Sequence, residues 1–469
     1  MKRQIATSAG ALALLAGGVL AATSGEFNIL SMNVAGLPEF LNNNEVPGDK
    51  ATNSETIGTR FAEYGYDIIH VQESLLAQSS FETIYILVPL APLALHSSFV
   101  ETEDFNYHAY IYETDTHPYR TATSGGVPFG SGLNTLANFD WIDFERVKWD
   151  TCSNDSGADC LTPKGFTFMR AVIDDGVYVD VYNLHADAGT EDGDETARAA
   201  NLQQVADAID ARSAGNAVLV FGDTNSRYTR PADGIRVFSS QNGLTDSWVE
   251  LIRGGTVPDT ETICDNPSTT NECETVDKVF YRGSPLLDLT ATYWNYESTK
   301  FLQSNGSILS DHNPITVNFT WSAGSSLRQS GFWGGPHGTW FSDVTALATK
   351  TSPKVSTLNF RGASRLDSVG LALTDGTTFT HGGDGGNAAT LTLGSNEFWT
   401  SAQLCQGQKN DRTRNFYIKA TTSSGKSLEA GTSTSDCATF TAPNGWGIVG
   451  FLGQDGDEMD QLAFVYAPQ

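Results

Sequence analysis

The residues best suited to chemistry in this chain are carboxylates, amides and histidines that stand next to short apolar runs. They end the runs NILSMN, DIIHVQE, VYVDVYNLH and AVLVFGDTN, begin DKVFYRG, or precede NPITVNF. The set comprises Asn33, Glu73, His185, Asp223, Asn225, Asp277, Asp311 and His312. Carboxylate and amide oxygens suit hard cations such as Mg²⁺, and histidine titrates near neutral pH. These residue types therefore indicate a site for metal binding and proton transfer.

Each short motif also has an ordinary structural explanation. A Gln-Glu pair at the end of a strand is usually a surface carboxylate, and GDTN is more often an Asx-turn. Six motifs in one domain, each at a strand terminus, are much harder to explain in this way. Strand ends are where α/β sheets present functional side chains, because backbone pairing holds the strand while its tip meets solvent.

The elements that must position these residues lie between Phe27 and about Trp321. Short β-rich runs recur there, and one amphipathic helix is expected over 195–215. Its apolar positions fall on one face, and Gly215 lies just past its C-terminus. Strands joined by a helical crossover predict a layered α/β domain over 24–321.

The remainder of the chain has a different composition. A polar linker, SAGSSLRQ, is expected over 322–329. Residues 330–469 are rich in Gly, Ser and Thr and contain about a dozen short strand candidates without a convincing helix, which predicts an all-β domain. A chain of 469 residues is long enough for two such domains.

The order N…QE…NLH…GDTN…VDKVF…SDHNP resembles the endonuclease/exonuclease/phosphatase superfamily, which includes deoxyribonucleases and neutral sphingomyelinases. The resemblance implies a four-layer α/β sandwich of two packed mixed sheets and metal-assisted phosphodiester hydrolysis. It implies that Glu73 holds Mg²⁺ (or Mn²⁺) with help from Asn33, and that Asp311 is placed to assist. His312 is then the general base, held in its tautomer by Asp277.

The same resemblance assigns the groups around the phosphate. His185 and Asn225 are expected to hydrogen-bond its non-bridging oxygens, where charge grows in the transition state. Asp223 is expected to orient the nucleophile or assist the leaving group. Arg170 is expected to add a phosphate contact, with an ordinary surface arginine as the alternative.

The second domain resembles the jacalin-related lectins, which implies a β-prism of three four-stranded sheets. The likeness rests on GFWGGPHGTWFSD over 331–343, HGGDGG over 381–386 and the terminal loop from Gly456 to Asp460. It implies a carbohydrate site formed by Gly338, Gly456, Asp457, Met459 and Asp460. His337 stands where many relatives have glycine, and a β-prism that no longer binds sugar is the alternative.

Several features indicate secretion. Residues 1–21 combine Lys2 and Arg3 with an apolar run and small residues at a cleavage position, as signal peptides do, and the run is too short and Gly-rich to span a membrane. The cysteines fall into three sequence-near pairs, which predicts disulfides Cys152–Cys160, Cys264–Cys273 and Cys405–Cys437. Three glycosylation sequons occur, at Asn154, Asn305 and Asn318.

The charge of the chain bears on the substrate. A formal net charge of −27 disfavours nucleic acid and anionic membranes as partners, because both need a face lined by Lys and Arg. A bound cation reverses the local sign, so a single phosphate remains possible. We therefore expect a phosphodiesterase acting on a phospholipid headgroup, of the sphingomyelinase or phospholipase C type. The alternatives are a secreted nuclease and a glycan-binding protein whose enzyme domain is degenerate.

The segment 74–102 departs from the superfamily pattern, because it inserts a long, very apolar stretch after the QE motif. Three interpretations of this segment are open: a membrane-dipping loop, an irregular buried insertion, and a gene-model error. An error would allow Glu103 to replace Glu73 as the metal carboxylate. Glu73 is preferred, because the run DIIHV delivers it on a strand.

Overall fold

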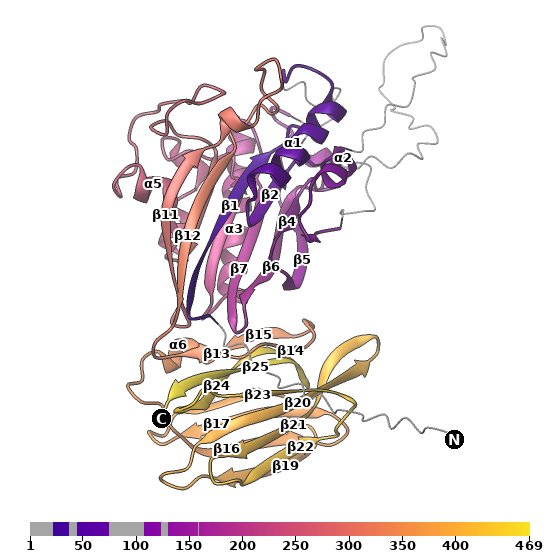
Figure 1. Ribbon diagram of the computed structural model, residues 1–469, viewed down its shortest axis with the longest axis vertical. Helices are drawn as coiled ribbons and strands as arrows, with labels where there is room; N and C mark the ends of the chain where they lie inside the picture. The colour runs from indigo at the N-terminus through magenta and orange to yellow at the C-terminus, as the bar shows by residue number, and fades with distance from the viewer. Residues whose placement is uncertain (1–21, 37–44, 75–106, 123–129, 158) are drawn as a thin grey trace, which may run out of the picture.

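The computed structural model describes residues 22–36, 45–74, 107–122, 130–157 and 159–469 (Figure 1). The predicted signal peptide, nearly all of the insertion 74–102, and Glu103 lie outside the described residues. Figure 1 shows an upper body of strands flanked by helices and a lower body made almost entirely of strands.

The upper body is built on two six-stranded sheets that pack face to face. The first has the order β11 (Leu287–Tyr296), β12 (Ile315–Ala323), β1 (Ser24–Asn33), β2 (Ile68–Gln72), β4 (Asn134–Ala137), β3 (Tyr119–Arg120). The second has the order β5 (Trp141–Lys148), β6 (Gly165–Asp174), β7 (Val177–His185), β8 (Ala217–Asp223), β10 (Asp277–Arg282), β9 (Thr245–Asp246). Both sheets are mixed, because β1–β2 and β7–β8 are parallel while the other named pairs are antiparallel.

Helices cover the outer faces and complete four layers. On the first sheet lie α1 (Lys50–Tyr64) and α2 (Tyr107–Thr114), and Phe61 of α1 packs with Leu30 and Val71. On the second lie α3 (Asp192–Arg212) and α4 (Val237–Ser240), while α5 (Ser247–Leu251) packs against the edge strand β11 of the first sheet and against β9 and β10 of the second. The predicted four-layer α/β sandwich is therefore confirmed.

The helix expected over 195–215 forms as α3. Its apolar residues Leu202, Val205, Ala206 and Ile209 are fully buried. The helix begins three residues earlier than expected, because the side chains of Glu191 and Asp194 form a capping box at its N-terminus.

The lower body contains three antiparallel sheets. The first has β13 (Arg328–Gln329), β25 (Met459–Pro468), β24 (Trp446–Asp455) and β15 (Thr339–Ser342), with β14 (Trp333–Gly334) also paired to β25. The second is β18 (Thr378–Gly382), β17 (Leu366–Leu373), β16 (Val355–Gly362), β19 (Asn387–Thr392). The third is β22 (Ser427–Gly431), β21 (Arg412–Thr422), β20 (Trp399–Lys409), β23 (Asp436–Thr441). The short helix α6 (Val344–Leu347) follows β15.

The core of this body explains why three sheets pack around one axis. Trp399 is fully buried, and its ring contacts Phe360 of the second sheet and Phe451 and Phe464 of the first. One aromatic side chain thus joins all three sheets, and the predicted β-prism is confirmed.

The three predicted disulfides, Cys152–Cys160, Cys264–Cys273 and Cys405–Cys437, are all present. The expected linker, 322–329, is partly ordered into sheets: its first two residues close β12 and its last two form β13.

The two bodies meet at the end of the sandwich where β7 begins. Tyr178, the second residue of β7, has its ring 5.1 Å from that of Phe332, and the indole of Trp340 donates to the carbonyl of Ala214 at 3.1 Å. The predicted catalytic residues lie where β7 ends. A strand of this length rises roughly 25 Å, so the two ends are well separated.

Candidate active site

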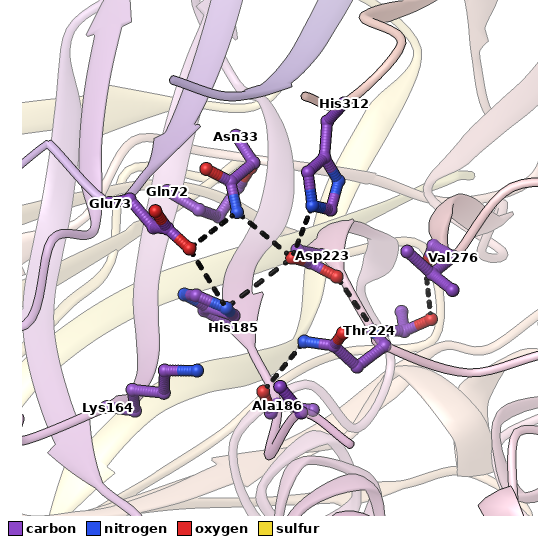
Figure 2. A network of polar contacts seen from close by, with 12 residues as sticks. Asn33, Gln72, Glu73, Lys164, His185, Ala186, Asp223, Thr224, Val276 and His312 are labelled. Atoms are coloured by element: carbon purple, nitrogen blue, oxygen red, sulfur yellow. Dashed lines mark hydrogen bonds and ion pairs between the residues drawn. The ribbon is translucent and has the colours of Figure 1, made fainter. Parts of the chain in front are cut away.

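Strand pairing brings the predicted catalytic residues to one edge of the sandwich (Figure 2). His185 and Asp223 end the parallel strands β7 and β8 opposite one another, and Asp277 begins the antiparallel strand β10 opposite Asp223. Asn33 ends β1, and Glu73 directly follows β2. Residues scattered over more than two hundred positions of sequence therefore converge where the strands end.

Asp223 is the centre of this cluster. Its carboxylate accepts a hydrogen bond from Asn33 Nδ2 at 3.2 Å, and its Oδ2 lies 3.4 Å from His185 Nε2 and 3.7 Å from His312 Nε2. Burial alone would raise the pKa of Asp223, but His312 and His185 outweigh burial and lower it. Asp223 is thus held as a carboxylate between two imidazoles.

His312 is fixed by a second carboxylate. Its Nδ1 lies 2.8 Å from Asp277 Oδ2, which leaves Nε2 facing Asp223. Burial opposes protonation, but the two aspartates prevail and raise the pKa of His312 well above its usual value. The backbone contributes too, because His312 N donates to Ser310 Oγ, which in turn donates to the carbonyl of Asn33.

Glu73 is presented by a left-handed backbone conformation, with a φ of 60° directly after β2. Non-glycine residues rarely adopt this conformation, and such strain gathers at functional sites. Its Oε1 accepts from Asn33 Nδ2 at 3.1 Å and lies 4.0 Å from His185 Nε2. Burial raises the pKa of Glu73, and burial together with Lys164 lowers the pKa of His185 to about 3, so this imidazole is neutral.

The donor set fits a divalent cation. Asp223, Asp277 and His312 offer ligand atoms that all lie within 4.8 Å of one another. Asp277 Oδ1 is buried and has no hydrogen-bond partner within the described part of the chain. Glu73 is a third buried carboxylate in the same network, although Asn33 turns its amide nitrogen toward Glu73 and its Oδ1 toward Ala35 N. Asn33 would have to reverse this amide to act as a ligand itself.

The remaining predicted residues occupy the rim of the cluster. The backbone N–H of Asn225 donates to Asp223 Oδ1 at 2.9 Å, and its side chain donates to the carbonyl of Ala186 at 3.1 Å. Asp311 is exposed, and its charge raises the pKa of both Glu73 and His312.

The expected phosphate contact from Arg170 is wrong. Its guanidinium is buried and donates to Asp180 at 2.7 and 3.2 Å and to Asp143 at 2.9 Å. Arg170 stands in the middle of β6, toward the second body, where its charge lies 3.9 Å above the ring of Trp340. Its donors are therefore engaged in a structural network away from the cluster.

Lys164 joins the cluster without having been anticipated. Its side chain is buried, and its Nζ lies 2.5 Å from Asp159 Oδ1. Its charge partly offsets the rise that burial causes in the pKa of Glu73, and it adds to the fall that burial causes in the pKa of His185. Figure 2 shows its amine directed toward His185. It precedes β6 in a stretch, TPKGF, that carries no distinguishing pattern, so only the fold reveals it.

In the second body the turn from β24 into β25 carries four of the predicted carbohydrate residues: Gly456 and Asp457 lie in the loop, and Met459 and Asp460 begin β25. A Cβ placed on Gly338 would lie 2.6 Å from Asp460 Oδ2, and one on Gly456 would lie 3.9 Å from the same atom. Asp457 is exposed, whereas the side chain of Met459 is buried in the core and leaves only its backbone for a ligand. Asp460 is also buried, and it forms an ion pair with Arg414 that the sequence pattern did not indicate.

Comparisons with known protein families agree with this geometry. The profile described as Endonuclease/Exonuclease/phosphatase family 2 matches residues 94–318, and the Jacalin-like lectin domain matches residues 330–465. Both resemblances drawn from the sequence are confirmed.

Among curated proteins, the chain is similar to sphingomyelinases of Mycobacterium tuberculosis and Mycobacterium bovis, each 36% identical over 303 residues. The match covers 63% of this chain and 53% of each relative, so the chain spans about half the length of these proteins. Among solved structures, it resembles a mannose binding jacalin related lectin from Ananas comosus, 20% identical with a TM-score of 0.28, over 31% of this chain and 100% of the lectin.

Proposed function

We propose that this chain, which consists of an endonuclease/exonuclease/phosphatase domain followed by a jacalin-like lectin domain, is a secreted phosphodiesterase that requires a divalent cation and cleaves a phospholipid headgroup. The linked groups Asp277, His312, Asp223 and His185 at one strand edge carry this proposal. They place a histidine with a fixed orientation beside a carboxylate in a buried site, which suits proton transfer during hydrolysis.

The residues divide the work as follows. His312, with Nδ1 held by Asp277, is the general base; because its pKa is raised, it takes the proton of the attacking water at Nε2 only in the fraction of molecules whose imidazole is neutral. Neutral His185 and the amide of Asn225 donate hydrogen bonds to the phosphate oxygens. Asp223 lies between the two imidazoles and orients both, and Lys164, just before β6, adds positive charge.

The proposed cation is Mg²⁺ or Mn²⁺, and Glu73 is proposed to hold it with help from Asn33. When bound, the cation would offset the negative charge on the phosphate. The buried Asp223 and Asp277, together with the half-buried His312, form a second group able to hold such an ion. The raised pKa of Glu73 supports this assignment, because a desolvated carboxylate gains most from a nearby cation.

The substrate class rests on the relatives and on charge. The relatives similar over 303 residues are named sphingomyelinases, and a net charge of −27 disfavours an extended polyanion. The three disulfides support secretion. Within the described residues, no helix has the length and apolarity to cross a membrane. The lectin domain is proposed to bind glycan through the loop that carries Asp460.

The test incubates the purified chain with sphingomyelin, lysophospholipid, plasmid DNA and inositol phosphates, with Mg²⁺ or with EDTA. We expect release of a phosphorylated headgroup that EDTA and His312→Ala both abolish, while Lys148→Ala, an exposed change on β5, keeps full activity. Cleavage of DNA alone would make the chain a nuclease. If no substrate is turned over, the proposed enzymatic activity is refuted, and a glycan-binding function remains as the alternative.

A further inference from the structure

A cavity of about 280 Å³ lies on the seam between the two domains, at the opposite end of the sandwich from the catalytic cluster. The catalytic domain lines it with residues from β5, β6 and the end of α3, and the lectin domain lines it with residues from the β14–β15 loop, β15 and β24. These residues include Phe144, Glu145, Arg212, Gly338, Trp340 and Gln454. A cavity of this size holds roughly one sugar ring.

The charged groups of this seam cavity occur in balanced pairs. Arg212 forms an ion pair with Glu145, and buried Arg170 forms one with Asp143. Gln454 extends the second pair, since its amide donates to Asp143 at 3.4 Å. Two carboxylates offset two guanidinium groups, so the lining suits an uncharged ligand rich in hydrogen-bonding groups rather than an ion.

The seam cavity also offers apolar surface. The rings of Phe144 and Trp340 are half-buried, and both lie among the lining residues. Aromatic rings beside planar amide, carboxylate and guanidinium groups provide both requirements of a sugar, which has apolar C–H faces and hydroxyls that donate and accept.

The seam cavity shares one residue with the surroundings of the lectin domain's sugar loop. Gly338 lines the cavity, and a Cβ placed on it would lie 2.6 Å from Asp460 Oδ2 and 2.4 Å from the carbonyl oxygen of Asp455. Gln454 lines the cavity two residues before that loop begins at Gly456. The two domains are held in this arrangement by Gln461, which donates to Asp143 at 2.8 Å.

We propose that the seam cavity is a second carbohydrate subsite, to which the catalytic domain contributes Phe144, Glu145 and Arg212. It receives the second unit of a neutral oligosaccharide whose first unit occupies the loop at Gly338 and Asp460. This inference rests on the sugar-binding part of the proposed function and is independent of phosphodiester hydrolysis.

The test is calorimetric titration of the full chain with methyl α-mannoside, methyl α-galactoside and the corresponding α-linked disaccharides. About two extra hydrogen bonds predict that one disaccharide binds roughly tenfold more tightly than its monosaccharide. Glu145→Ala and Arg212→Ala should remove this preference and leave the monosaccharide Kd unchanged. Their side chains are 53% and 30% exposed, so the fold should tolerate both changes, and Glu145→Gln repeats the test with the shape preserved.

The control is Lys148→Ala, which removes an exposed charge from the same strand, β5, outside the cavity and should behave as wild type. Equal affinity for mono- and disaccharides, or a preference that survives all three variants, would overturn the subsite. If only Asp460→Ala changes sugar binding, and the Glu145 and Arg212 variants bind mono- and disaccharides as the wild type does, then the loop binds sugar and the subsite proposal is overturned. A wild-type chain that binds no sugar but still cleaves its phosphodiester would overturn the inference while leaving the enzymatic proposal standing.

Discussion

Replacing Arg170 by methionine separates the structural role of this residue from a role in phosphate binding. Its guanidinium makes contacts at 2.7, 2.9 and 3.2 Å to two buried carboxylates, Asp180 and Asp143. Methionine fills a similar volume but leaves both carboxylates without their cation. Breaking a buried ion pair from one side costs about 3–5 kcal/mol. At about 2–4 °C per kcal/mol for a large domain, the melting temperature should fall by about 6–20 °C.

The assay compares thermal unfolding with phosphodiester hydrolysis in Arg170→Met. We expect a lower melting temperature and, at a temperature where the chain is folded, an unchanged kcat/KM. Arg212→Met is the matched control, because its partner Glu145 is exposed and such pairs contribute about 0–1 kcal/mol. Unchanged stability together with a large loss of hydrolysis would refute the structural assignment and restore Arg170 as a phosphate contact.

Three further changes test other parts of the structure. Asp277→Asn should lower kcat by about 10²- to 10⁴-fold at a temperature where the chain is folded, because it releases the orientation of a general base; steady-state kinetics check this, and full activity would contradict it. His117, whose pKa is raised because Asp115 and a backbone carbonyl outweigh burial, stabilises the fold below its unfolded pKa of about 6.5, and this contribution is lost as pH rises through the folded value. His117→Gln should therefore cost more stability at pH 5 than at pH 9 in urea unfolding, and an equal cost at both would refute the sign. Replacing Cys405 and Cys437 by alanine should destabilise the lectin domain by about 2–4 kcal/mol in calorimetry, and an unchanged transition would show that β20 and β23 do not need the bond.

Much of the architecture could be read from local patterns. Alternating and continuous apolar runs indicated the strands, and a period of 3.6 indicated the helix that became α3. The polar residues that end those strands indicated the candidate site, because a strand end has a defined place in a layered sheet. The sequence-near cysteine pairs were also correct, since short spacing restricts the partners available.

Side chains whose environment depends on distant segments could not be assigned in this way. Arg170 looked like a free cation on a strand, and only packing revealed the two aspartates that bury it. Lys164 lacked any motif, and its proximity to His185 follows from how β6 and β7 align. Asp460 was expected to face a sugar, but Arg414 on another sheet pairs with its carboxylate.

The sequence by itself determined the chemistry available to this protein: which carboxylates, amides and histidines stand at strand ends, and the two domains that carry them. Tertiary structure alone decided their partners. Asn33 and Asp223 are 190 residues apart yet lie 3.2 Å from one another, and Gln461 and Asp143 are 318 apart yet join the two domains at 2.8 Å. Local patterns report the burial and periodicity of neighbouring residues, whereas contacts over such separations depend on how whole sheets pack. The seam between the domains therefore has no signature in the sequence.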